Sequence, residues 1–366
     1  MTKDLKIDKI FLASIILLTL AGFVIFTSAS LGLLARNGAS FAPVAIKQSV
    51  SLVLGCIVFF LMSKLPYKNL KKYAFYILVS AIFLNLLLFI PFFSLNHGGA
   101  SRWIDLRFIT FQPSEFLKIA FIIYFAAWLS NIKEKVLTLK MGIFPYVVII
   151  CTLGLILLGQ RDTDTLIVIA GTGMIMLFTA GAKIKHIALL SLSMLTILSL
   201  FLFFFRPYAI QRVTTYLNGA SDSLGSGYQI QQSLIAIGSG EITGRGFGQS
   251  IQKFSYLPEP IGDSIFAVGA EEFGFIGGVG LIILFLLFLF RSIKISVQAQ
   301  DNFGGLVVIG IAILIIVESF MNISSMLGII PLSGMPLLFV SHGGTALIIT
   351  LGAVGIIANI SKYKKS

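Results

Sequence analysis

Ten long apolar runs constrain the fold of this 366-residue chain more than any other feature. Each is close to the roughly 20 residues that cross a bilayer as an α-helix. Because 57% of the residues are hydrophobic and only 11% are charged, a soluble globule could not bury so much apolar side chain. The sequence therefore predicts an all-α, polytopic integral membrane protein with about ten transmembrane helices, folded as a single membrane domain over residues 1–366. The runs cover about residues 10–34, 44–62, 73–93, 113–130, 142–159, 165–181, 187–205, 265–290, 304–321 and 342–360.

The basic residues predict the orientation. If the N-terminus is cytoplasmic, most of the 27 Lys and Arg residues fall in short cytoplasmic segments, in agreement with the positive-inside rule. An even number of spans then places both termini in the cytoplasm. This topology and the anionic lipid headgroups explain the net charge of +12. No basic patch is interleaved with aromatic residues on a soluble face, so no nucleic-acid partner is predicted.

Two segments on the outer side are long enough to hold a site. One is residues 94–112, and the other is a large, glycine-rich extracytoplasmic loop of about residues 206–263 between the seventh and eighth helices. Function is therefore expected on the outer face. Cys56 and Cys151 fall inside spans and are predicted to be small buried residues with no role in a disulfide or a metal site.

Carboxylates at the end of the large loop are the first candidates for chemistry. Glu259 and Asp263 stand directly before the eighth apolar run, which then carries Glu271 and Glu272. Acids at the rim of the hydrocarbon are energetically costly and are commonly functional. Asp263 is the first candidate for a catalytic residue.

Glu115 and Lys118 are a second candidate pair. They lie three residues apart, which places them on one face of a helix, where they can form an ion pair. Pro113 and Glu115 also suit the first turn of a helix for structural reasons. A substrate role and a structural ion pair are equally supported. From its residue type alone, Trp103 is interpreted as an aromatic residue of the membrane interface.

The glycine-rich loop also holds Arg245, which could meet a phosphate, although a solvated external arginine is the simpler interpretation. Its Gly-x-Gly pattern follows a span rather than a strand, which excludes a dinucleotide-binding turn.

Dense prolines and glycines between residues 322 and 344 predict broken backbone, packed in protein or lining a watery cavity. The glycosylation pattern Asn322-Ile323-Ser324 lies at the end of a span and is interpreted as a chance match. Glu318, one helical turn earlier, is predicted to be a buried acid with a structural role and no assignable partner.

Four separated motifs occur in order across nearly the whole chain. They are Phe111–Lys118 (FQPSEFLK), Gly227–Ser233 (GYQIQQS), Leu257–Glu259 with Asp263, and Gly334–Gly344 (GMPLLFVSHGG). Together with the ten-span pattern, these motifs specifically resemble those of the shape, elongation, division and sporulation family, the FtsW and RodA proteins. The run Gly246–Lys253 is more similar to the division member than to RodA.

The resemblance implies a peptidoglycan glycosyltransferase that polymerises lipid II, an undecaprenyl-pyrophosphate disaccharide peptide, on the outer face of the bacterial cytoplasmic membrane. It implies a class B penicillin-binding transpeptidase and other division membrane proteins as partners. The family's essential aspartate falls on Asp263, its loop tryptophan on Trp103, and its motif Glu and Lys on Glu115 and Lys118. The candidate substrate-binding residues, from the motifs and the external segments, are Trp103, Arg102, Glu115, Lys118, Asp162, Arg245, Glu259 and Ser341.

The implied reaction joins the sugar 4-hydroxyl of one lipid II to the anomeric carbon of a chain that leaves as undecaprenyl pyrophosphate. Such a site needs a base near the hydroxyl and positive charge near the diphosphate. Asp263 is the expected base. Lys118, Arg102 and Arg245, or a divalent cation such as Mg²⁺ or Mn²⁺, are the candidates for the leaving group. Beyond this candidate cation no cofactor is assigned, and no metal ligands are named.

The chain departs from the family pattern at three notable positions. Where the family usually has Gln-Pro-Asp-x-Gly-Thr, Arg161 and Asp164 replace the Pro and the Gly, and Glu241 interrupts a usual Gly-aromatic run. Whether these residues impair activity does not follow from the sequence. Restoring Pro at residue 161 and Gly at residue 164 is expected to raise activity or stability, because both changes restore the family's turn.

Two other functions remain open. A lipid II flippase would use Glu271, Glu272 and Glu318 along a transport path and would show inverted repeats, which are not evident. A non-catalytic scaffold of the division machinery is supported only by the departures from the family pattern.

Overall fold

The structure is a computed structural model that describes residues 6–35, 41–97, 100–105, 110–132, 136, 138–205 and 226–363. Within these ranges, eight helices are long and apolar enough to cross a membrane. Two shorter apolar helices, Thr163–Thr179 and Gly344–Ile360, complete the set. These segments match the ten predicted runs, so the prediction of a multi-span helical membrane protein is confirmed.

The helix bounds differ from the predicted runs mainly at the ends. Charged residues continue the helical hydrogen bonding past the apolar runs, so α3 begins six residues early and α10 ends eight residues late. The ranges are α1 (Lys9–Leu31), α2 (Phe41–Lys64), α3 (Tyr67–Leu86), α4 (Pro113–Ile132), α5 (Phe144–Gly159), α6 (Thr163–Thr179), α7 (Ile184–Phe205), α9 (Ser226–Ser239), α10 (Ile265–Gln298), α11 (Asn302–Met326) and α12 (Gly344–Ile360).

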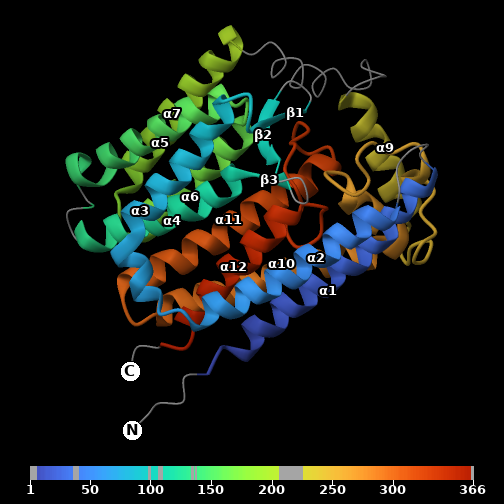
Figure 1. The fold of residues 1–366 in the computed structure, drawn as a ribbon, viewed down its shortest axis with the longest axis horizontal. Helices are drawn as coiled ribbons and strands as arrows, with labels where there is room; N and C mark the ends of the chain where they lie inside the picture. Colours follow the sequence, from blue (N-terminus) through green and yellow to red (C-terminus); the bar gives the residue numbers. More distant parts are fainter. Residues whose placement is uncertain are drawn as a thin grey trace.

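The axes of the long helices are roughly aligned, and both chain termini lie at one end of the molecule (Figure 1). We call this the terminal end, and we call the opposite end, where the small sheet and α9 lie, the loop end. Helix α12 lies in the middle and contacts α1, α2, α3, α4, α10 and α11. Helices α11 and α12 are buried along most of their length, whereas α7 exposes apolar side chains to the surroundings.

Both cysteines lie on the exposed surface, so the prediction that they are buried was wrong. The apolar runs alone do not distinguish the face of a helix that packs on protein from the face that meets lipid, because both are apolar.

Ion pairs and caps define the helix ends at the terminal end. Asp8 caps α1 by accepting a hydrogen bond from Phe11 N at 3.0 Å. Its carboxylate also accepts two hydrogen bonds from Arg291 of α10, both at 2.7 Å. Asp301 caps α11 through Gly304 N. At the loop end, Pro113 opens α4 as predicted.

A three-stranded antiparallel sheet follows α3 and was not predicted. Its strands are β1 (Ser94–His97), β2 (Ala100–Asp105) and β3 (Thr110–Phe111), in that order. Trp103 lies opposite Leu95 in this sheet. The Thr345 hydroxyl at the start of α12 donates to the Thr110 carbonyl at 2.6 Å, so the sheet is tied to the central helix.

Helix α10 is interrupted at Gly274, whose φ of 66° lies in the left-handed region that favours glycine. Residues 241–246, which we call the strap, occupy this break. The N–H groups of Phe275 and Ile276, on the far side of the break, donate to strap carbonyls, and strap N–H groups donate to the carbonyls of Glu271 and Glu272. The broken backbone is therefore satisfied by protein, as it must be at membrane depth.

The segment of residues 327–343, which we call the connector, joins α11 to α12 without a helix or strand. Its middle is buried, with Leu337 and Val340 fully inaccessible. This confirms the prediction of irregular backbone packed in protein. The connector lies against the loop that carries Asp263, and it therefore shapes the candidate site.

Candidate active site

Asp263 ends a compact loop, residues 257–263, that we call the Asp263 loop. Gly262 N and Ser264 N both donate to the carbonyl of Glu259, at 3.1 and 3.2 Å, which folds the loop into a turn. Glu259 has a φ of 44° in this turn and its side chain is exposed. Asp263 itself is half-buried and lies just before the first turn of α10, where the N–H groups of a helix favour a negative charge.

Ser341 of the connector contacts the Asp263 loop directly. Its hydroxyl accepts a hydrogen bond from Leu337 N at 2.8 Å and donates to the Gly262 carbonyl at 2.9 Å. The side chain is buried. The structure thus brings this predicted site residue to the site, where it holds main chain.

Asp164 of α6 lies near Asp263, beside Gly334 of the connector. A Cβ atom built on Gly334 would lie 3.8 Å from Oδ2 of each aspartate. A side chain at residue 334 would therefore meet both carboxylates. Asp164, which the sequence presents only as a departure from the family pattern, is thus part of the surroundings of Asp263.

Arg102 and Asp162 come together from β2 and the turn before α6. The guanidinium lies 3.8 Å from Oδ1 of Asp162 and also donates to the Arg161 carbonyl. Asp162 is buried, whereas the Arg102 side chain is 21% exposed. Arg102 therefore presents a positive charge that is anchored on one side and open on the other.

Lys118 is buried between two helices rather than open to a ligand. Its ammonium donates to Glu115 at 2.8 Å and to both carboxylate oxygens of Glu318, at 2.8 and 2.7 Å. All three residues are at most 4% exposed. The predicted pair on α4 is confirmed, and Glu318 of α11 has Lys118 as its partner. Because three hydrogen bonds use the three ammonium protons, Lys118 does not face a diphosphate directly.

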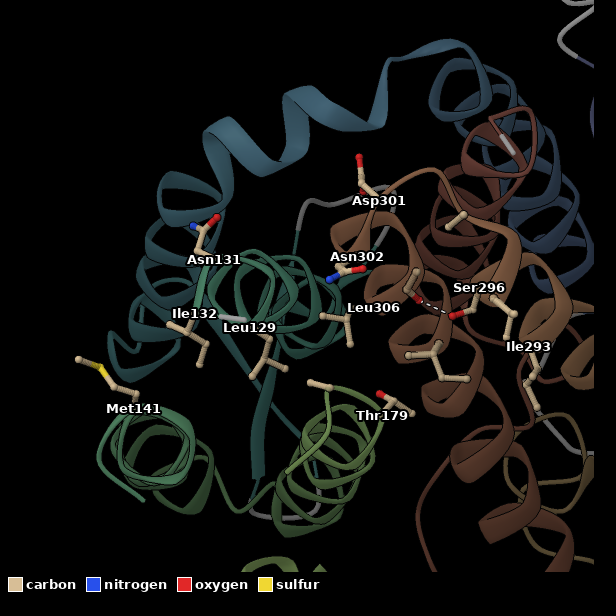
Figure 2. A pocket seen from close by; sticks show the side chains of 15 residues that line it. Leu129, Asn131, Ile132, Met141, Thr179, Ile293, Ser296, Asp301, Asn302 and Leu306 are labelled. Carbon is tan, nitrogen blue, oxygen red and sulfur yellow. Dashed lines mark hydrogen bonds between the residues drawn. The ribbon is translucent and has the colours of Figure 1, made fainter. Parts of the chain in front are cut away.

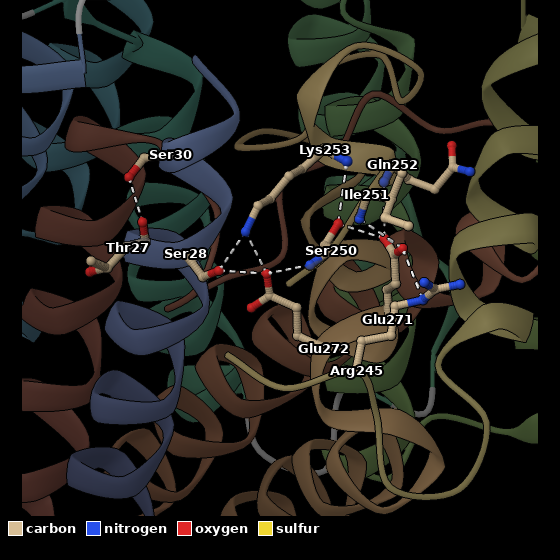
Figure 3. A network of polar contacts seen from close by, with 10 residues as sticks. All are labelled: Thr27, Ser28, Ser30, Arg245, Ser250, Ile251, Gln252, Lys253, Glu271 and Glu272. Carbon is tan, nitrogen blue, oxygen red and sulfur yellow. Dashed lines mark hydrogen bonds and ion pairs between the residues drawn. The ribbon is translucent and has the colours of Figure 1, made fainter. Parts of the chain in front are cut away.

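Arg245 belongs to a separate polar network that ties the large loop to α1 and α10 (Figure 3). Its Nε lies 3.5 Å from Glu271, and its side chain is 38% exposed. Glu271 also accepts hydrogen bonds from Ser250 Oγ at 2.5 Å and from the main-chain N–H of Ile251 at 3.0 Å.

Lys253 is the buried cation of this network. It donates to Glu272 at 2.6 Å and to Ser28 of α1 at 3.0 Å, and none of its surface is exposed. The network fixes the residues that directly precede the Asp263 loop (Figure 3).

His342 borders the Asp263 loop and packs between α1 and α2. Its ring stacks on Phe26 with 5.6 Å between ring centroids, and its Nδ1 lies 3.1 Å from the side-chain oxygen of Gln48. Burial, followed by the charge of Lys47, lowers the pKa of the imidazole, so the ring is neutral at pH 7. Because a neutral ring must donate to an amide oxygen, the proton lies on Nδ1.

A cavity lies at the terminal end, away from these residues (Figure 2). It measures about 1130 Å³ and lies between α4, α6, α10 and α11. Its wall is mainly apolar, with Asn131, Ser296 and Asn302 among its polar members. Its one lining carboxylate, Asp301, is already bonded to Gly304 N and to the Tyr67 hydroxyl. The cavity therefore offers little polar chemistry.

The turn at Arg161 contradicts the expected benefit of a proline there. Arg161 has a φ of 62°, and its N–H donates to the Leu158 carbonyl at 3.2 Å. Proline fixes φ near −65° and has no N–H. The Arg161→Pro variant should therefore lose more than about 1 kcal/mol of stability, whereas Arg161→Gly should be neutral or gain up to about 1 kcal/mol. Equilibrium unfolding in detergent measures both, and a Pro variant as stable as the parent would exclude the left-handed turn.

Several residues of this region were not assigned by the sequence. Asn322, dismissed as a chance glycosylation match, donates to the Asp263 carbonyl at 2.8 Å. Gln229 of α9, inside a matched motif but without an assigned role, donates to the Ser264 hydroxyl at 2.9 Å. Their position in or beside the family motifs is the sequence feature that could have identified them.

The described residues do not include 206–225, the first part of the large external loop.

These elements define a multi-span membrane protein with a polar site built at one end from two loops and the helix ends. The family model described as cell cycle protein, FtsW/RodA/SpoVE, matches residues 8–366. The chain therefore belongs to the FtsW/RodA/SpoVE family.

Named relatives and solved structures agree with this assignment. The chain is 39% identical over 326 residues to stage V sporulation protein E of Bacillus subtilis strain 168, which covers 88% of this chain and 87% of the relative. It is 37% identical over 354 residues to the probable peptidoglycan glycosyltransferase FtsW of Geobacter sp. strain M18, covering 97% and 96% of the two chains.

Two solved structures share the fold. A chain from a structure described as coordination of polymerization and crosslinking by a peptidoglycan synthase complex has a TM-score of 0.74 and 25% identity, over 94% of this chain and 98% of that chain. The rod shape determining protein RodA of Thermus thermophilus has a TM-score of 0.71 and 22% identity, over 98% of each chain.

Proposed function

We propose that this chain is a peptidoglycan glycosyltransferase that polymerises lipid II, most similar in role to FtsW. The observation that carries the proposal is the position of Asp263 directly before α10, on a loop whose main chain is held by the connector, in a chain 37% identical to a probable peptidoglycan glycosyltransferase over nearly its full length. A base at the membrane rim suits a substrate whose sugar is outside the membrane and whose tail is within it.

In the proposed reaction, Asp263 takes the proton of the acceptor 4-hydroxyl as the oxygen attacks the anomeric carbon of the donor. A glycosidic bond forms, and the bond from that carbon to the diphosphate breaks, so undecaprenyl pyrophosphate leaves. Arg102 is the better placed of the candidate cations for the diphosphate, because it is anchored by Asp162 and partly exposed. Arg245 is exposed but pairs with Glu271, and Lys118 is enclosed. Trp103 and Glu259 would contact the bound substrate.

A divalent cation fits this site in part. The described residues contain no group of three or more His, Cys, Asp and Glu side chains suited to a metal ion. Asp164 and Asp263, which border Gly334, could supply two carboxylates, and the diphosphate could supply the remaining oxygens. Mg²⁺ is often bound in this way, through one or two carboxylates and substrate phosphates. When bound, it would neutralise charge on the leaving diphosphate.

We propose that the loop end is extracytoplasmic, that both termini are cytoplasmic, and that the membrane is the bacterial cytoplasmic membrane. The basic residues favour this orientation. We propose a class B penicillin-binding transpeptidase as partner, with other division proteins, supported by the similarity to a chain of a peptidoglycan synthase complex.

The orientation is testable with single cysteines on a background in which the two native cysteines are replaced. In whole cells, a cysteine at residue 101, in β2, should react with an impermeant external reagent. A cysteine in place of Ser296, near the terminal end of α10, should react only after the membrane is permeabilised. The reverse pattern would invert the proposed topology and remove the outer-face site.

The flippase alternative loses support from the side-chain contacts. Its three acids are already engaged: Glu318 with Lys118, Glu272 with Lys253, and Glu271 with the strap and the residues after it. A non-catalytic scaffold would have no need for a carboxylate at residue 263 on a loop held by main-chain hydrogen bonds.

One pair of assays separates these functions. Purified protein, with and without its transpeptidase partner, is given fluorescent lipid II in liposomes, and glycan polymer and transbilayer movement are measured in parallel. A glycosyltransferase yields polymer, whereas a flippase yields movement without polymer and a scaffold yields neither.

A further inference from the structure

The backbone of the Asp263 loop is held by three consecutive hydrogen bonds from α11 and the connector. The carbonyls of residues 261, 262 and 263 each accept one donor from these two elements. The bonds are His342 N to Ile261 O at 2.7 Å, Ser341 Oγ to Gly262 O at 2.9 Å, and Asn322 Nδ2 to Asp263 O at 2.8 Å.

Asn322 makes the bond nearest to the carboxylate and also binds the connector. The same amide nitrogen donates to the Met335 carbonyl at 2.7 Å. Asn322 therefore connects Asp263 with the residue after Gly334, beside which the Asp164 carboxylate also lies. The amide orientation is unambiguous, because a flipped side chain would place its oxygen against two carbonyl oxygens.

The burial of Asn322 makes these two bonds strong constraints. The side chain is fully inaccessible and extends from α11, which is buried over most of its length. Its Oδ1 atom has no hydrogen-bond partner among the described residues. An unsatisfied buried acceptor costs about 1–3 kcal/mol, so an apolar side chain would suit packing alone better. Such local conflicts are expected where a residue serves a site rather than the core.

The Asp263 loop is held by its internal turn and by these bonds rather than by regular secondary structure. It contains no helix or strand, and its turn depends on the left-handed Glu259. Fixing the carbonyl of Asp263 fixes its Cα and leaves only the side-chain torsions to place the carboxylate. A displacement of about 1 Å in a catalytic group can lower a rate a hundredfold.

We propose that Asn322 is a positioning residue for Asp263. By hydrogen bonding to the carbonyls of Asp263 and Met335, it fixes the carboxylate relative to α11 and to the connector. Its role in catalysis rests on the proposed function, whereas its hold on the loop does not.

The test compares Asn322→Leu with Asn359→Leu. Asn359 is the control at the terminal end, because it is also buried and also bonds main chain: it accepts a hydrogen bond from Tyr67 N at 3.1 Å and donates one to Ser63 O at 2.7 Å. Each variant leaves two main-chain groups without their side-chain partner, so both should lose stability, and the rates are compared per folded molecule. Only Asn322→Leu should lower kcat per folded molecule, by about 10- to 100-fold, with KM for lipid II changed by less than about twofold.

A double-mutant cycle separates positioning from general damage. In an Asp263→Asn background, Asn322→Leu should change the residual rate by less than about twofold, because the group it positions is no longer a base. An equal loss in both backgrounds, or an equal kcat loss in Asn359→Leu, would overturn the proposal.

Hydrogen exchange of the peptide covering residues 257–264 supplies a readout that needs no activity. Asn322→Leu should raise its exchange rate, and Asn359→Leu should not. Unchanged exchange would overturn the proposal even if the rate falls.

If the parent makes no polymer, the proposed function fails, while the exchange measurement still decides whether Asn322 holds the loop. If Asn322→Leu does not fold, Ser341→Ala, which removes one neighbouring bond and little volume, should show the same pattern at about 3- to 10-fold.

Discussion

Replacing Asp263 with asparagine is expected to lower the rate of glycan polymerisation by about 10²- to 10⁴-fold. Asparagine keeps the shape of the side chain but cannot accept the proton of the attacking hydroxyl. The main-chain bond from Asn322 to residue 263 does not depend on the side chain, so the loop should keep its position. Folding and partner binding should therefore survive. The measurement is single-turnover polymerisation of fluorescent lipid II by the purified variant.

Glu241→Gln is the matched control for this substitution. Glu241 is an exposed carboxylate of the strap, and it contributes a main-chain carbonyl rather than its side chain to the break in α10. Removing its charge should change the rate by less than about twofold. If Asp263→Asn polymerises at close to the parent rate, the base must be another acid, with Glu259 and Asp162 next to be replaced, or the function is not glycosyl transfer.

The spans were predictable because hydrocarbon leaves the backbone few choices. A long apolar segment in lipid must satisfy its hydrogen bonds internally, so an apolar run implies a helix. The ends were less predictable, since charged turns such as the start of α3 can stay helical in the headgroup region. The break at Gly274 could not be foreseen, because it depends on the strap, whose N–H groups and carbonyls fill it from thirty residues away in the sequence.

The sequence named several residues of the candidate site, but it did not indicate which residues they contact. Family motifs marked Asp263, Lys118 and Ser341, yet their partners lie far away in the sequence. Glu318 is 200 residues from Lys118, and Ser341 is 79 residues from Gly262. Asn322 resembled a chance glycosylation match because its role depends on contacts across the fold. The left-handed turn at Arg161 was likewise hidden, since residue type alone favours ordinary backbone there.

Lys118→Met is expected to be the most destabilising single substitution at the site. It removes the cation between Glu115 and Glu318 and leaves two carboxylates in a dry interior. Removing one partner of a buried ion pair costs about 3–5 kcal/mol, because the remaining charge is unsolvated. The free energy of unfolding in mixed micelles measures the loss. Lys68→Met, on the exposed start of α3, removes the same charge where water still solvates the surroundings and should be nearly silent.

Glu318→Gln distinguishes a charge effect from a packing effect in this cluster. The amide keeps the volume and an acceptor oxygen, and Lys118 keeps Glu115 as its counterion. The cluster then changes from two carboxylates and one ammonium to one of each, so no isolated charge is left in the interior. The expected loss is about 1 kcal/mol, far less than for Lys118→Met. Equal losses in the two variants would mean that packing between α4 and α11, rather than the paired charges, accounts for the stability of this contact.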